Sequence, residues 1–186
     1  MIKPYPAILA IACLLFVQGC GPLLVRDATT GTYAPVRGGT FELLEDVTIR
    51  AGRTRTYLQG GAIVGGVNEF QPHCQLEINT LSESPQTVRA DRFIVTRIGT
   101  RTDQVVQSAP LQLAALNGIA RWPFDGFDNG ESRRMYVYVF SLHSDRQPDV
   151  RALTCGGAFD SPGLALPPTL GDIARALGRY GSLQLQ

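Results

Sequence analysis

The sequence predicts a mostly β protein, an antiparallel β-sandwich or open barrel with one short α-helix near the carboxyl end. Short segments in which apolar and polar residues alternate recur along the chain, and they are rich in β-branched and aromatic residues. Stretches rich in glycine, proline and asparagine separate these segments. A helical spacing of apolar residues stands out close to the carboxyl end.

The first strands are expected over residues 41–44, 47–49, 53–58 and 62–64. In the third of them, Arg53, Arg55 and Tyr57 alternate with threonines and Leu58, so one side should face solvent and the other the core. The glycine-rich segment 60–66 lacks the lysine and the strand-to-helix context of a phosphate-binding loop. We therefore expect it to supply bends at a sheet corner.

The later strands are expected over residues 74–79, 93–98, 102–106, 134–142 and 150–155. Cys74, Leu76 and Ile78 occupy alternate positions and should face the core. Residues 134–142, RMYVYVFSL, give the strongest strand signal because they are dense in aromatic and β-branched residues. Inward-facing residues of these strands are expected to fill one core.

The helix is expected between Thr169 and Gly178. Thr169 is a favourable N-cap, Asp172 stands at the third helical position, and Gly178 is a favourable closing residue. One face carries the apolar residues Leu170, Ile173, Ala174 and Leu177. We expect this face to pack against the sheet; a helix that docks onto a partner is the alternative.

The amino terminus has the pattern of an export signal. Lys3 precedes an apolar run from Ala7 to Val17, which is too short to span a bilayer. The sequence Val17-Gln18-Gly19-Cys20 then resembles the lipobox of bacterial lipoproteins. This resemblance implies cleavage before Cys20, diacylation of its sulfur with fatty acids such as palmitate, and acylation of the new amino terminus. An ordinary secretory leader that is cut nearby is the alternative.

The lipobox divides the chain into a signal peptide (1–19), a lipidated cysteine with a flexible tether (20–39) and a single β-rich globular domain (40–186). The tether is expected because residues 21–39 are rich in glycine, proline and threonine and show no periodicity. Gly21 differs from the aspartate that resembles an inner-membrane retention signal in enterobacterial lipoproteins. The predicted location is therefore the outer membrane, facing the periplasm.

The cysteines sort by position. Cys13 lies in the leader and Cys20 would carry lipid, which leaves Cys74 and Cys155 in a compartment that permits disulfides. We therefore predict a Cys74–Cys155 bridge. The alternatives are a catalytic thiol and a metal site that adds His73 and His143, but the short ligand spacing of structural zinc sites is missing. No metal and no cofactor are predicted.

No catalytic residue is predicted. His143, Ser144 and Asp145 are the residue types of a nucleophilic triad, but sequence neighbours do not converge on one substrate atom, so we expect a turn. Aromatic residues in a turn-rich region form a candidate ligand or partner surface, with a small hydrophobic cluster under a loop as the alternative. These residues are Trp122, Phe124 and Phe127.

Charge and resemblance limit the function. The formal net charge of +1 argues against nucleic acid as a partner. Residues 71–74 (QPHC), 153–155 (LTC) and 168–178 (PTLGDIARALG) resemble uncharacterised proteobacterial envelope lipoproteins, which imply a location but no activity. We expect a non-enzymatic accessory or interaction subunit of an envelope complex, held at the membrane by lipid and bound to an envelope protein. The alternatives are a periplasmic lipoprotein that binds a small ligand and, less favoured, an envelope hydrolase.

Overall fold

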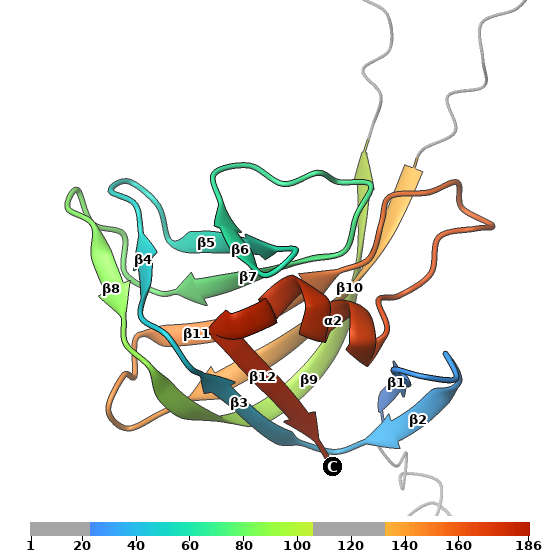
Figure 1. The fold of residues 1–186 in the computed structure, drawn as a ribbon, viewed down its shortest axis with the longest axis horizontal. Coiled ribbons are helices and arrows are strands. Elements are labelled where there is room, and N and C mark those ends of the chain that lie inside the picture. The colour runs from blue at the N-terminus through green and yellow to red at the C-terminus, as the bar shows by residue number, and fades with distance from the viewer. Residues whose placement is uncertain (1–22, 106–132) are drawn as a thin grey trace, which may run out of the picture.

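A computed structural model describes residues 23–105 and 133–186. Eight antiparallel strands form one curled sheet with the shape of a half barrel (Figure 1). In spatial order the strands are β12 (Gly181–Leu185), β3 (Gly39–Leu43), β9 (Asp91–Val105), β10 (Arg133–His143), β11 (Val150–Gly156), β7 (His73–Ile78), β5 (Arg55–Gln59) and β6 (Ala62–Val64). The predicted fold class, mostly β with an open barrel and one short carboxyl-terminal helix, is confirmed.

Smaller elements accompany this sheet. The hairpin of β1 (Leu23–Arg26) and β2 (Tyr33–Val36) forms one two-stranded sheet, and β4 (Val47–Ile49) pairs with β8 (Gln86–Val88) in another. Helix α2 (Leu170–Leu177) continues into the 3₁₀ turn η1 (Gly178–Tyr180). Within residues 23–105 and 133–186, no helix is long and apolar enough to cross a bilayer.

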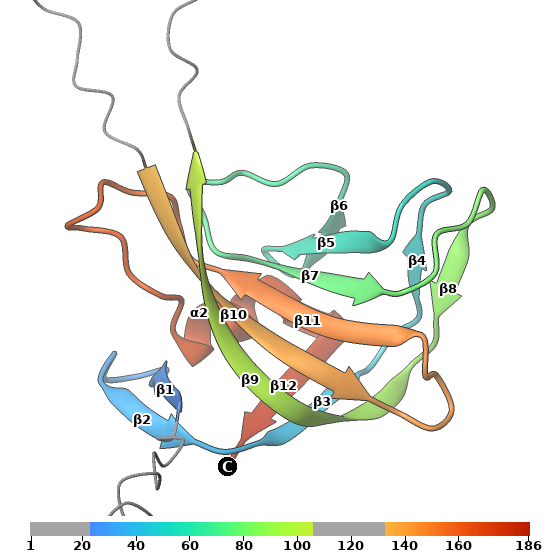
Figure 2. The same cartoon turned by 180° about the vertical axis from the view of Figure 1, so that it is seen from behind.

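The core lies between the concave face of the sheet and helix α2. Inward residues of the central strands are fully buried, among them Phe41, Phe93, Phe140 and Leu153. Figure 1 views the sheet from the helix side, and Figure 2 shows the sheet from behind with α2 beyond it. Because side chains fill the concave side, burial of this apolar surface is the main term that stabilises the fold.

Helix α2 begins and ends where the sequence predicts. The Thr169 side chain accepts a hydrogen bond from the backbone N–H of Asp172, and the Asp172 carboxylate accepts one from the backbone N–H of Thr169, so the capping box is complete. The helix packs on the sheet, as predicted, through Ile173, Ala176 and Leu177. Ala174, which was assigned to the apolar face, is exposed.

The carboxyl end of α2 meets the turn between β5 and β6 through two glycines. Gly178 has a φ of 53°, in the left-handed region, and the N–H of Gly61 donates to the Ala176 carbonyl oxygen at 3.2 Å. A methyl group on residue 178 would overlap the Cα of Gly61. The sharp bends expected in segment 60–66 therefore allow the helix to approach this corner of the sheet.

Gly178→Ala should lower the free energy of unfolding by about 2 kcal/mol, because it adds both backbone strain and a steric overlap. Urea denaturation followed by circular dichroism measures the loss. Gly163→Ala is the matched control, because a β-carbon at residue 163 meets no atom within 4 Å. Equal stability of the two variants would contradict the tight contact between Gly178 and Gly61.

The predicted flexible tether is wrong for residues 23–39. This segment forms the β1–β2 hairpin and the start of β3, and Val25 is buried in the core. The backbone N–H of Arg26 donates to the Tyr138 hydroxyl at 3.3 Å, and the Arg26 guanidinium donates to the Pro167 carbonyl oxygen at 2.7 Å. These long-range contacts hold a segment whose composition alone indicates a linker.

Candidate functional site

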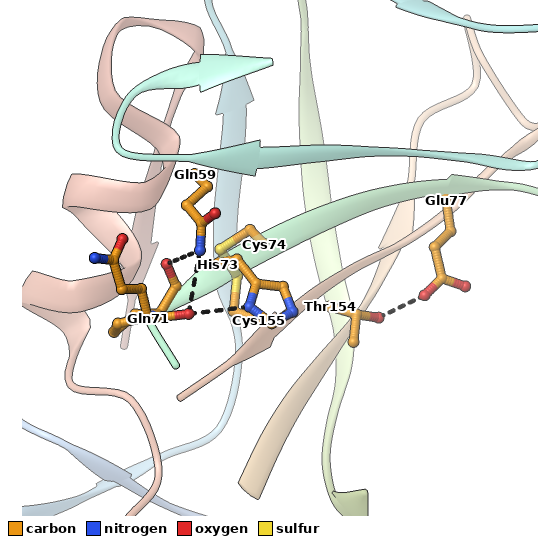
Figure 3. Close-up of a disulfide and its surroundings, with 8 residues drawn as sticks. Gln59, Gln71, His73, Cys74, Glu77, Thr154 and Cys155 are labelled. Atoms are coloured by element: carbon orange, nitrogen blue, oxygen red, sulfur yellow. Dashed lines mark hydrogen bonds between the residues drawn. A yellow bond between two sulfur atoms is a disulfide. The ribbon is translucent and has the colours of Figure 1, made fainter. Parts of the chain in front are cut away.

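The predicted disulfide is present and joins β7 to β11. Cys74 and Cys155 lie directly opposite each other on these neighbouring strands, with Cα atoms 4.1 Å apart, and both are fully buried (Figure 3). His73 lies on the opposite face of β7, where its Nδ1 is 3.1 Å from the carbonyl oxygen of Gln71. The two cysteines thus form the predicted disulfide. The alternatives, a metal site and a catalytic thiol, would both require free thiols.

His143 is the last residue of β10, and Ser144 and Asp145 lead the chain out of this strand, as expected. The Ser144 hydroxyl donates to the buried carboxylate of Asp91 at 2.7 Å, whereas exposed His143 lies 3.1 Å from Asp145. Ser144 therefore anchors this segment to the start of β9. No group of three His, Cys, Asp or Glu side chains that could hold a metal occurs within the two ranges that the structure covers.

The outer face of β7 carries a buried carboxylate that sequence alternation alone places toward solvent. Glu77 has a side chain only 6% exposed. Its carboxylate accepts a hydrogen bond from Thr154 Oγ1 at 2.8 Å (Figure 3). It also accepts one from Gln75 Nε2 at 2.7 Å and forms an ion pair with Arg151. The network therefore links β7 to β11 on the face opposite the disulfide.

The environment of Glu77 keeps it ionised. Burial alone raises the pKa of its carboxyl group, but the hydrogen bonds from Arg151 and Thr154 and the positive charges of Arg151 and Arg55 outweigh burial. The pKa of Glu77 is therefore lower than its ordinary value of 4.5. Because its oxygens are occupied by these partners, we assign Glu77 a structural role.

A cavity of about 570 Å³ opens beside β5 on the same side of the sheet. Its wall includes Arg50 and Arg53 from the β4–β5 turn and Arg55 from β5. Strand β6 and the loop that follows it complete the wall, with Ile63, Val64, Gly65, Gly66, Val67 and Glu69. We call this cavity, defined by Arg50, Arg53 and Arg55, the arginine cleft.

The β4–β5 turn places two of these arginines. The N–H of Arg53 donates to the carbonyl oxygen of Arg50 at 3.1 Å, and Gly52 takes the left-handed φ of 70° that this turn uses. The N–H of Gly52 donates to the Ser82 carbonyl oxygen at 2.8 Å, which ties the turn to the β7–β8 loop. The backbone of the turn is thus held on both sides.

The opposite wall of the arginine cleft is held by Gln59 at the end of β5. Its side-chain amide donates to the Asn68 carbonyl oxygen and accepts from the Asn68 N–H, both at 2.9 Å. The guanidinium of Arg50 packs against Gly65, where an added β-carbon would lie 3.3 Å from Nη1. Figure 3 shows Gln59 reaching toward the residues before β7. A side chain at residue 65 would therefore crowd Arg50.

The predicted site residues are only partly covered by the structure. It brings Cys74 and Cys155 together, whereas Cys20 and the aromatic residues Trp122, Phe124 and Phe127 lie outside the described residues. The arginine cleft was not predicted. The pattern R-x-x-R-x-R at residues 50–55, next to the glycine-rich segment 60–66, is the signal that would have indicated it.

Comparisons of the chain with protein-family models, with curated proteins and with solved structures find no match. The function proposed below therefore rests on the residues of this chain.

Proposed function

We propose that this chain is an exported, lipid-anchored protein of the bacterial outer membrane, which faces the periplasm and acts as a non-enzymatic accessory subunit of an envelope complex. The disulfide is the observation that best supports export. Cys74 and Cys155 are fully buried and bonded, and such structural disulfides are typical of oxidising compartments such as the periplasm. The lipobox-like sequence Val17–Cys20 supports anchoring at Cys20.

The short connection between Cys20 and β1 determines how the domain would sit at the membrane. Strand β1 begins at Leu23, and three residues span at most about 10 Å. The domain would therefore rest close to the bilayer surface at its β1–β2 end, without the long tether that composition indicates. The β4–β5 turn and the loop after β6, which lie across the molecule from the β1–β2 hairpin in Figures 1 and 2, would face away from the membrane.

Lipid attachment is tested by replacing cysteines of the leader. Cells that express wild type, Cys20→Ser or Cys13→Ser are labelled with a palmitate analogue, and the protein is then purified. Wild type and Cys13→Ser should be labelled, because Cys13 lies within the segment that is removed. Cys20→Ser should lose the label and accumulate as the longer, uncut chain. Equal labelling of all three proteins would contradict an anchor at Cys20.

The accessory role is tested by photocrosslinking in intact cells. A photoreactive residue replaces Ile63 on β6, which would face away from the membrane, or Tyr33 on β2, which would face it; both side chains are exposed. A subunit of an envelope complex should give a discrete protein adduct from residue 63 and little from residue 33. If neither position gives a protein adduct at native abundance, the protein is not such a subunit.

A further inference from the structure

We propose that the arginine cleft binds the phosphate group of a small molecule. Three guanidinium groups line the cavity, from Arg50, Arg53 and Arg55, and among the described residues Glu69 is the one carboxylate in its wall. The local charge of the cleft is therefore positive, although the whole chain has a formal net charge of only +1. Gathering like charges on one surface is unfavourable unless an anion compensates them.

The guanidinium groups of the cleft are available for a ligand. Six arginines elsewhere on the surface are paired with carboxylates, in Arg92–Glu42, Arg101–Asp103, Arg146–Asp91, Arg151–Glu77, Arg175–Asp172 and Arg179–Glu45, whereas others, such as Arg37 and Arg97, form no ion pair with the described residues. In the part of the chain that the structure describes, none of the three cleft arginines forms an ion pair with a carboxylate. Arg55 lies opposite Glu77 across the β5–β7 pairing, but Glu77 is bonded to Arg151.

The chemistry of the lining matches a phosphate group. A guanidinium presents planar pairs of N–H donors that fit phosphate oxygens, and it stays charged at all physiological pH values. Thr48, Thr54 and Tyr57 also line the cleft and bring hydroxyl donors. Gly65 and Gly66 do not form a phosphate-binding loop here, since the next described element is strand β7; the contribution of Gly65 is space beside Arg50.

The size of the cleft indicates that the phosphate belongs to a larger molecule. A volume of about 570 Å³ lies in the range of small-molecule sites and exceeds what a phosphate ion alone would fill. Ile63, Val64 and Leu81 add apolar surface to the wall. The ligand that fits is therefore a phosphomonoester or phosphodiester with a compact organic part, bound at its phosphate by the arginines.

The source of this ligand depends on the proposed anchoring, whereas the phosphate chemistry does not. If the β1–β2 end rests on the bilayer, the β4–β5 turn and the loop after β6, whose residues line the cleft, lie across the molecule from it (Figures 1 and 2). The headgroups of the same bilayer would then be out of reach. We therefore expect a phosphorylated molecule that is free in the periplasm, and the test below separates it from a lipid headgroup.

Binding is tested by isothermal titration calorimetry on the purified full chain in a nonionic detergent. The titrants are inorganic phosphate and glycerol 3-phosphate, at constant ionic strength. The cleft variant is R50Q/R53Q/R55Q. The control variant, R37Q/R92Q/R97Q, removes the same charge from exposed arginines that do not line the cleft. Equal unfolding midpoints of the two variants establish that both are folded.

We expect saturable binding of glycerol 3-phosphate to wild type and to the control variant with equal affinity. The cleft variant should bind at least about tenfold more weakly, because it loses charge-assisted hydrogen bonds. If the natural ligand is a free phosphorylated molecule, micelles that contain phosphatidylglycerol should leave the binding of glycerol 3-phosphate unchanged. If it is a lipid headgroup, these micelles should compete with glycerol 3-phosphate. The absence of saturable binding, or an equal loss in both variants, would overturn the proposal. That outcome leaves the palmitate test of anchoring unaffected.

Discussion

Removal of the Cys74–Cys155 bridge is expected to lower the free energy of unfolding by about 3–4 kcal/mol. The two cysteines are 81 residues apart in the chain, so the bond removes much of the conformational freedom of the unfolded state. A loss of this size is a large part of the 5–15 kcal/mol that stabilises an ordinary domain. The reduced protein should therefore unfold at a markedly lower urea concentration.

The measurement compares the oxidised wild type, the reduced wild type and the variant C74A/C155A by urea denaturation. Reduced wild type and the variant should both be destabilised, and reductant should not change the variant further. Alanine is preferred to serine because both positions are fully buried and a hydroxyl there would lack a partner. An unfolding midpoint that stays the same when both thiols are freed would contradict a stabilising role for the bridge.

Glu77→Ala is expected to lower the free energy of unfolding by about 3 kcal/mol. The substitution leaves the Thr154 hydroxyl and the Gln75 amide without their acceptor, and it removes the ion-pair partner of Arg151. Glu42→Ala is the matched control, since Glu42 also pairs with an arginine, Arg92, but on the exposed surface. Glu42→Ala should lower the free energy of unfolding by less than about 1 kcal/mol. Similar losses in the two variants would contradict a special role for the buried network.

The stabilisation by Glu77 should depend on pH in a defined direction. Because its pKa is lower in the folded than in the unfolded protein, ionised Glu77 stabilises the fold at pH values above about 4.5, its ordinary pKa. This contribution is lost as the pH falls through the lowered pKa of the folded state. The difference in unfolding free energy between wild type and Glu77→Gln should thus shrink below pH 4.5 and stay constant above it. If the difference between wild type and Glu77→Gln grew on acidification, the pKa of Glu77 would be raised, not lowered, in the folded protein.

The local features of the fold were readable from the sequence. Alternation placed Cys74, Leu76 and Ile78 toward the core, and Thr169 and Asp172 marked the start of the helix. These predictions succeed because strand alternation and helix capping act over a few residues. The disulfide was predictable as well, because only two cysteines remain outside the leader region.

Features that depend on distant residues were not readable. Strands β1, β2, β8 and β12 were missed, because they are short and their stability comes from pairing and burial within the assembled fold. Residues 93–98 and 102–106 were predicted as two strands, but residues 93–98 and 102–105 belong to the single long strand β9, and Val106 lies outside the described residues. Glu77 lies on the outward side of β7, as alternation requires, yet partners from β11 bury it.

The arginine cleft shows the same limit for the candidate site. The alternation of Arg53, Arg55 and Tyr57 predicted a polar side of β5, and Arg55 and Tyr57 do line the cavity on that side. The cavity itself requires the β4–β5 turn, strand β6 and the loop that ends before β7 to come together. Arg50 and Glu69 line the same cavity although they lie on different loops, one before β5 and the other after β6. The local pattern R-x-x-R-x-R at residues 50–55 marks the arginines, but the convergence of these segments on one cavity follows from tertiary structure.

The position of β12 has a consequence for the order of events during biogenesis. This strand, residues 181–185, pairs with β3, residues 39–43, and so closes the edge of the sheet next to the first large strand. Because the two strands are separated by most of the sequence, this sheet edge cannot be completed until residues 181–185 have been synthesised. A nascent chain that has not yet reached residue 181 would thus leave the outer edge of β3 without its partner strand.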